Sequence, residues 1–141
     1  MTWTCWSILV AHYINIKCIE TDTKCFIQAF NEDETWLSTI VLDIKCDEYP
    51  RYKEYCNGNK LIKIIRVETN PHYVGQGIAS KLIKLTLEKY KNTNFVLLCS
   101  PCKRLENTDT LKTAADLQIF YAKFGFVRTN ELLPTMIYKA I

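Results

Sequence analysis

Two glycines one residue apart, at positions 75 and 77, stand between a β-prone run and a helical pattern. Residues 61–69 are dense in β-branched side chains and predict a strand. From Ala79 to Tyr90 apolar residues recur at helical spacing opposite a lysine-rich side, which predicts an amphipathic helix packed on a sheet. The apolar run 94–100 predicts a second, buried strand. Together these patterns predict a strand–helix–strand crossover whose helix begins at the glycines.

The first turn of a helix that begins at such a junction is a favourable place to bind an anion. Its first N–H groups have no intrahelical acceptor and carry partial positive charge, and glycine places no Cβ atom in front of them. The dinucleotide fingerprint needs glycine or alanine at position 80, where Ser80 stands, and the phosphate loop GxxxxGK[ST] is absent. These residues alone leave two interpretations open: a phosphate-binding loop, or a helix-entry turn whose glycines only relieve crowding.

The rest of the chain predicts mainly strands. The alternating apolar residues of the first 16 positions predict one buried strand; they are Ile8, Val10, Tyr13, Ile14 and Ile16. Residues 24–31 and 35–45 flank a short acidic stretch and predict a β-hairpin. Pro50 and the Asn57-Gly58 pair predict a loop that contains at most a helical turn. Two closing strands are expected at 126–130 and 135–141.

Composition excludes some classes of function. A chain of 141 residues is expected to form one domain, and a formal charge of +3, spread along the sequence, gives no reason to expect a nucleic-acid partner. The uncharged N-terminal stretch ends at Lys17, which is too short to span a membrane, and it lacks the features of a signal peptide. Seven cysteines without such a signal predict free thiols in the cytoplasm. The single CxxC pair, Cys99 and Cys102, is weak evidence for zinc, and no metal site is expected.

A second signature follows the crossover, where residues 120–126 read Phe-Tyr-Ala-Lys-Phe-Gly-Phe. Leu117, Phe120, Tyr121 and Phe124 fall on one face of a predicted helix that Gly125 ends. The phenylalanines suit a core, whereas the hydroxyl of a buried Tyr121 needs a polar partner.

With both motifs in this order, the chain resembles the GNAT superfamily of N-acetyltransferases. Residues 74–79 follow the acetyl-CoA loop of that family at Gly77 and Ala79, and residues 120–126 follow its second signature, hydrophobic-Tyr-x-Lys-x-Gly-Phe. The resemblance covers residues 60–128 well and the first 59 residues only as generic strands. It implies an α/β (α+β) fold: a single domain, 1–141, with a mixed, mostly antiparallel sheet and a central β-α-β unit for acyl-CoA.

The resemblance also implies a site and a reaction, with acetyl-CoA as the acyl donor. Backbone N–H groups of residues 74–79 would bind the pyrophosphate, and the pantetheine arm would lie between diverging strands. Tyr121 would protonate the leaving thiolate, and Glu68 would take the proton of the amine, although an exposed strand-end carboxylate is an equal interpretation. His72 is a weaker candidate for the base. The expected residues for binding acetyl-CoA are Val67, Thr69, Val74, Gly75, Gln76, Gly77, Ile78, Ala79 and Ser80.

Three departures from the family bear on function. Val74 stands where arginine or glutamine is usual, and the asparagine usual early in the second helix is replaced by alanines, with Asn107 as the nearest substitute. The two helices that usually separate the first two strands and form the acceptor wall are missing, since only residues 21–24 lie between the strand patterns.

An open acceptor side favours a protein lysine or N-terminus as the amine. A small polyamine or aminosugar is the alternative acceptor, with residues 47–56 as a wall and Asp47, Glu48 and Glu54 as partners for its charge. The alternative function is a non-catalytic acyl-CoA-binding or protein-interaction module on the same fold.

Overall fold

The computed structural model describes residues 2–9, 13–99, 114–129 and 134–140. In these ranges the chain forms one sheet of eight strands, in the spatial order β1-β2-β3-β4-β5-β6-β8-β7. The strands are β1 (Thr2–Leu9), β2 (Tyr13–Glu20), β3 (Lys24–Asn31), β4 (Trp36–Asp43), β5 (Lys60–Thr69), β6 (Thr93–Leu98), β7 (Val127–Arg128) and β8 (Thr135–Tyr138). The helices are the 3₁₀ turns η1 (Cys46–Glu48), η2 (Pro50–Tyr52) and η3 (Pro71–Tyr73), and α1 (Lys53–Cys56), α2 (Ile78–Lys89) and α3 (Ala114–Ala122).

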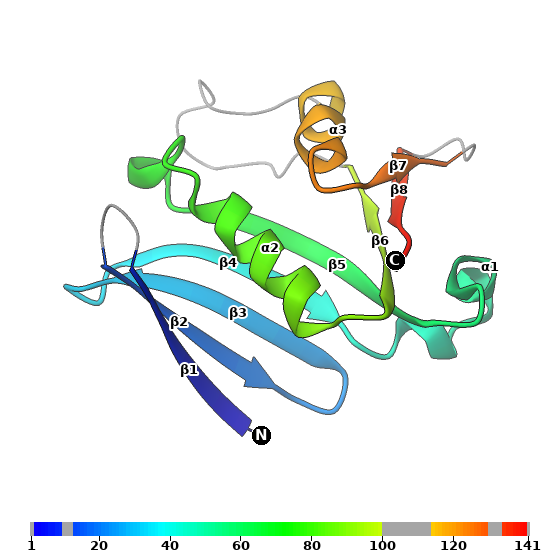
Figure 1. Ribbon diagram of the computed structural model, residues 1–141, viewed down its shortest axis with the longest axis horizontal. Helices are drawn as coiled ribbons and strands as arrows, with labels where there is room; N and C mark the ends of the chain where they lie inside the picture. The colour runs from blue at the N-terminus through cyan, green and yellow to red at the C-terminus, as the bar shows by residue number, and fades with distance from the viewer. Residues whose placement is uncertain (1, 10–12, 100–113, 130–133, 141) are drawn as a thin grey trace.

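The predicted fold class is confirmed. Neighbouring strands of the sheet pair antiparallel except β5 and β6, which are parallel and joined through α2. Figure 1 shows α2 lying across one face of the sheet. Within the described residues, no helix combines the length and the apolar character that crossing a bilayer requires.

The prediction of a single N-terminal strand was wrong. Residues 2–9 and 13–20 are two strands that pair antiparallel from Thr2↔Glu20 to Leu9↔Tyr13. The β-prone pattern continues across both strands without a glycine or proline, so the sequence contains no ordinary signal for the break. Val10, which was expected within the strand, lies outside the described residues.

The predicted hairpin of β3 and β4 is confirmed, and its turn is held by Asn31. The Oδ1 atom of Asn31 accepts hydrogen bonds from the backbone N–H groups of Asp33 and Thr35, both at 2.9 Å. A short polar side chain that bonds backbone two and four residues ahead is typical of tight turns. The preceding connection, residues 21–23, joins β2 directly to β3, so no helix separates these strands.

The main core lies between the sheet and α2. The helix buries Ile78, Leu82, Ile83 and Thr86 against strands β3, β4 and β5. Alternate residues of the strands, such as Ile27 and Ile40, supply the other side of this core. Each such aliphatic side chain contributes about 1.5–3 kcal/mol through burial, so α2 is fixed firmly on the sheet.

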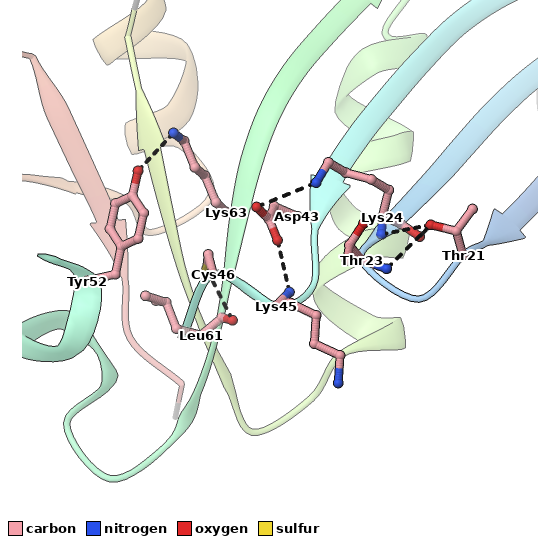
Figure 2. A network of polar contacts seen from close by, with 9 residues as sticks. All are labelled: Thr21, Thr23, Lys24, Asp43, Lys45, Cys46, Tyr52, Leu61 and Lys63. Carbon is pink, nitrogen blue, oxygen red and sulfur yellow. Dashed lines mark hydrogen bonds and ion pairs between the residues drawn. The ribbon is translucent and has the colours of Figure 1, made fainter. Parts of the chain in front are cut away.

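The opposite face of β5, β6 and β8 carries a second, smaller cluster. Cys46, Leu61 and Val96 are buried there under the segment 46–56, which is called the covering segment below. The segment is tied to the sheet by polar contacts: Lys63 donates to the hydroxyl of Tyr52 at 2.8 Å, and the Cys46 thiol donates to the Leu61 carbonyl at 3.4 Å (Figure 2). The same view shows the Lys24–Asp43 ion pair, at 3.7 Å, beside these contacts.

Candidate functional site

The pairing of strands β5 and β6 ends halfway along β5. Their parallel register runs from Lys60↔Thr93 to Ile64↔Leu97 and goes no further among the described residues, although β5 continues to Thr69. On its other side β5 stays paired with β4 as far as Ser38↔Thr69. The second half of β5 therefore has one edge that faces away from β4 and is not covered by β6.

Hydrogen bonds to β4 show which backbone groups face that edge. Asn70 N–H donates to the Leu37 carbonyl at 2.8 Å, and the Glu68 carbonyl accepts from Ser38 Oγ at 2.6 Å. Both groups point toward β4, and successive residues of a strand direct their N–H and C=O groups to opposite edges. The N–H and C=O groups of Val67 and Thr69 therefore point into the gap beside β6.

The gap opens where β5 contains a bulge. Leu42 pairs with Ile64 and Val41 pairs with Arg66, so Ile65 is an extra residue in β5. A bulge reverses which side chains face which side of the sheet. Ile62 and Ile64 pack against the α2 side before the bulge, and Val67 packs there after it. Arg66 and Glu68 consequently project from the face opposite α2.

The loop between β5 and α2 is held by Asn70. Its Nδ2 donates to the Trp36 carbonyl at 2.8 Å, and its Oδ1 accepts from His72 N–H at 3.1 Å, which starts the turn η3. These bonds bind the beginning of the loop to β4. The glycines that follow are therefore presented from a fixed position rather than from a free loop.

Gly75 and Gly77 both need the conformations that only glycine adopts easily. Their φ angles are 84° and 76°, and Gly77 is the N-cap of α2 without a side-chain cap. A Cβ atom added at either position would meet no atom within 4 Å, so the space in front of them is open. Lys81 N–H makes the first helical bond, to the Gly77 carbonyl at 3.2 Å, and the preceding helical amides have no intrahelical acceptor.

The other expected residues around these glycines differ in their exposure to solvent. Ile78 is buried in the main core, while Val74, Ala79 and Ser80 are half-buried and Gln76 is exposed. Free helical amides, two positive-φ glycines and open space are features of helix starts that bind anions.

Glu68 is held by an ion pair. Its Oε1 lies 2.8 Å from Nε of Arg66, and its side chain is 37% exposed. The two residues are two positions apart in one strand and lie on the same face, so they form a local pair that solvent still reaches. His72 is exposed in η3.

Tyr121 lies near the end of α3 and is 7% exposed. Its ring packs edge-on against Phe120 and Phe126, with ring centroids 5.2 and 5.7 Å away. Its carbonyl accepts from Phe124 N–H at 3.0 Å, which closes the helix before Gly125. Gly125 has a φ of 101°, which favours glycine, and an added Cβ would crowd the Tyr138 ring at 3.2 Å.

The expected site residues come from the end of β5, the loop before α2, the start of α2 and the end of α3. Val67, Glu68 and Thr69 lead directly into the glycine loop, and Tyr121 belongs to the same core cluster as Ile78 and Leu97. Asn107 and Cys102 lie outside the described residues, and Cys99 is buried after β6. In the described ranges no three His, Cys, Asp or Glu side chains gather as a metal site would require.

One expected element lies elsewhere. For a small cationic acceptor, the sequence suggests a wall in the covering segment, with Asp47, Glu48 and Glu54. It packs on Leu61, at the start of β5, whereas the glycines follow Thr69 at the far end of that strand, and Leu61 and Thr69 are about 26 Å apart at the usual rise per residue. Asp47 and Glu48 line a shallow depression of about 580 Å³ together with three lysines, so its charge is mixed.

Sequence reasoning missed Ser38, Arg66 and Asn70. The Arg66–Glu68 pair has a signal in the sequence, because opposite charges two residues apart in a strand share a face unless a bulge intervenes. Ser38 and Asn70 carry no such signal, since their roles depend on the register between β4 and β5.

Comparisons with known proteins identify a family and structures of similar fold. A sequence profile of the acetyltransferase (GNAT) family matches residues 4–126. A comparison with curated proteins gave no match of significance. Among solved structures, a histone acetyltransferase HPA2 and related acetyltransferase from Corynebacterium glutamicum superposes with a TM-score of 0.57 at 12% identity, over 85% of this chain and 67% of that one.

Two further structures are similar in fold. A putative acyl-CoA N-acyltransferase from Klebsiella pneumoniae has a TM-score of 0.56 at 10% identity, over 87% of this chain and 77% of that one. A NatC complex bound to Gag peptide and CoA has a TM-score of 0.51 at 19% identity, over 82% and 71% of the respective chains.

Proposed function

Because this chain belongs to the acetyltransferase (GNAT) family, we propose that it transfers an acetyl group from acetyl-CoA to the primary amine of a protein lysine or N-terminus. The observation that carries the proposal is the continuous path from the open edge of β5 to the glycine-capped start of α2. Members of the family use acyl-CoA, and this path offers N–H donors for its pyrophosphate and a strand edge for its pantetheine arm.

The proposed donor site combines a helix terminus and a strand edge. The amides of Ile78, Ala79 and Ser80 would bind the pyrophosphate, because they lack helical acceptors and stand behind glycines. The edge groups of Val67 and Thr69 would pair with the amides of the pantetheine arm as an added strand does. Val74 supplies no charge to this site, so the proposed contacts depend mainly on the backbone.

The proposed chemistry is direct attack by the amine on the thioester carbon. The nitrogen–carbon bond forms, the carbon–sulfur bond breaks, and the carbonyl oxygen carries the negative charge until the thiolate leaves. A backbone N–H at the edge of β5 would stabilise that oxygen. Glu68 would accept the proton of the amine and Tyr121 would donate one to the thiolate, so charge and protons balance.

Two observations support a macromolecular acceptor. The tight β2–β3 connection leaves no helix pair between these strands to enclose a small molecule, and the covering segment lies at the other end of β5. A structural neighbour, the NatC complex, is described with a peptide beside CoA. A polyamine or an aminosugar is the alternative, and a direct assay separates them.

The test is release of the CoA thiol from acetyl-CoA in the presence of poly-lysine, a peptide with a free N-terminus, spermidine or kanamycin. We expect acetylated poly-lysine or peptide, identified by mass. Tyr121→Phe should lower kcat by about 10²-fold or more while the dissociation constant of acetyl-CoA stays within twofold. Tyr52→Phe, on the covering segment, is the matched control and should keep kcat. Acetyl-CoA binding without turnover of any acceptor would favour the non-catalytic module instead.

A further inference from the structure

Thr39 lies next to Glu68 in a row of side chains that crosses four strands. The register pairs Lys17 with Gln28, Gln28 with Thr39, and Thr39 with Glu68. Residues directly opposite each other in an antiparallel pair project from the same face of the sheet. Thr39 and Glu68 are therefore immediate neighbours on the face opposite α2.

The hydroxyl of Thr39 already accepts two hydrogen bonds. Trp36 Nε1 donates to its Oγ1 at 2.6 Å, and Gln28 Nε2 donates to the same atom at 3.4 Å. Trp36 reaches Thr39 because the register between β3 and β4 shifts by one residue, which leaves Leu37 as a bulge and brings Trp36 to the face of Thr39.

A threonine hydroxyl has two acceptor positions and one proton to donate. The two bonds from Trp36 and Gln28 fill the acceptor positions, so the O–H must be directed at a third group. Thr39 is only 7% exposed, and in the hydrogen bonds found among the described residues its Oγ1 acts only as an acceptor. A buried donor without an acceptor costs free energy, so this proton is available for a partner on the acceptor side.

Glu68 is the acceptor that the register places beside this proton. One carboxylate oxygen of Glu68 is engaged by Arg66 at 2.8 Å, and a carboxylate can accept several hydrogen bonds. We propose that Thr39 is a positioning residue for Glu68, donating to its second carboxylate oxygen, directly or through one water, when the acceptor amine is bound. This inference rests on the proposed function, in which Glu68 takes the proton of the amine.

Two fixed donors would restrict a flexible side chain to one orientation. Arg66 holds Glu68 along β5, and Thr39, itself fixed by Trp36 and Gln28, would hold it across the sheet. A general base works only within hydrogen-bonding reach of the proton it removes, so loss of one donor should lower kcat. The proposed site for acetyl-CoA lies along the edge of β5 that faces away from β4 and at the start of α2. The binding of acetyl-CoA should therefore not change.

The experiment uses Thr39→Val, which keeps the shape and removes the hydroxyl, and Thr39→Ser, which keeps the hydroxyl. Thr86→Val is the matched control, since Thr86 is also buried and its hydroxyl donates within α2 to the Leu82 carbonyl at 2.7 Å. The first readout is the carboxyl ¹³C signal of Glu68, assigned with Glu68→Gln, in protein saturated with a lysine peptide and with CoA, which has no acyl group to transfer. The second is kcat for that peptide and KM for acetyl-CoA.

We expect Thr39→Val to move the Glu68 signal and to lower kcat about tenfold, with KM for acetyl-CoA within twofold of the parent. Thr39→Ser should restore both, and Thr86→Val should change neither. An unmoved Glu68 signal in Thr39→Val, or equal kcat in Val and Ser variants, would overturn the proposal. If the parent acetylates no amine, the proposed function fails, and the carboxyl signal still decides whether Thr39 contacts Glu68.

Discussion

Gly77 and Gly58 form a natural comparison at the scale of single residues. Both have positive φ, 76° and 83°, and an added Cβ would meet nothing within 4 Å at either position. Alanine should therefore cost each about 1–2 kcal/mol of unfolding free energy through backbone strain alone. Only Gly77 stands at the start of α2, before the amides to which we assign the pyrophosphate.

Thermal unfolding with and without acetyl-CoA tests this difference. The parent and Gly58→Ala should gain about 2.7 kcal/mol at 100 times the parent's dissociation constant. Gly77→Ala should gain clearly less at the same concentration, since its methyl group occupies the approach to the amides. Equal gains in both variants would assign Gly77 to a helix-entry turn alone.

Single residues also show how far the sequence could lead. Gly75, Gly77 and Tyr121 can be proposed from motifs, because local conformation and neighbouring positions single them out. Ser38 and Thr39 were not, because their importance comes from facing Thr69 and Glu68 across two strands. No local pattern reports which residue of β4 stands opposite which residue of β5.

At the scale of elements, the covering segment is held by a buried thiol. Burial, with the carboxylates of Asp43 and Asp47 nearby, raises the pKa of Cys46 from 9.0 to about 12. The unfolded chain releases this proton near pH 9 and the folded chain retains it. The contribution to stability is thus complete below pH 9 and falls by about 1.4 kcal/mol per pH unit between pH 9 and about 12.

Cys46→Ala isolates that contribution. The variant should be less stable near neutral pH, because it leaves a small cavity beside Leu61. Its unfolding free energy should then fall less steeply than that of the parent above pH 9, so the two curves converge. Denaturant unfolding between pH 7 and 10.5 measures both slopes, and parallel curves would contradict the assigned cause.

Elements with strong internal periodicity were predictable, and those set by register were not. The spacing of apolar residues identified α2, and the acidic turn identified the hairpin of β3 and β4. The division of the N-terminus into β1 and β2 and the bulges at Leu37 and Ile65 left no mark in residue type. Those bulges decide that Trp36, Arg66 and Glu68 share a face with Thr39.

At the scale of the whole molecule, the two faces of the sheet have different tasks. The face under α2 carries the main core, and α2 begins where the donor is proposed to bind. The opposite face carries Glu68 and Arg66 at one end and the covering segment at the other. We therefore expect donor and acceptor to approach β5 from different sides.

This division predicts how the rate depends on the size of the acceptor. With no helix pair between β2 and β3, an isolated amine finds few contacts, whereas a peptide can use the sheet face on both sides of its reacting amine. Contacts remote from the reacting nitrogen lower the barrier by positioning it, so longer acceptors should gain in kcat/KM. Lysine amide should therefore react at least tenfold less efficiently than a ten-residue peptide that contains one lysine.

The test measures kcat/KM for four acceptors of different size: lysine amide, spermidine, a tripeptide and the ten-residue peptide. A steady rise with length would support the open acceptor face, and the rise should persist at high salt if apolar and backbone contacts carry it rather than charge. If spermidine equals or exceeds the long peptide, the acceptor must be enclosed after all. The walls would then have to come from parts of the chain other than the covering segment, which stands at the far end of β5.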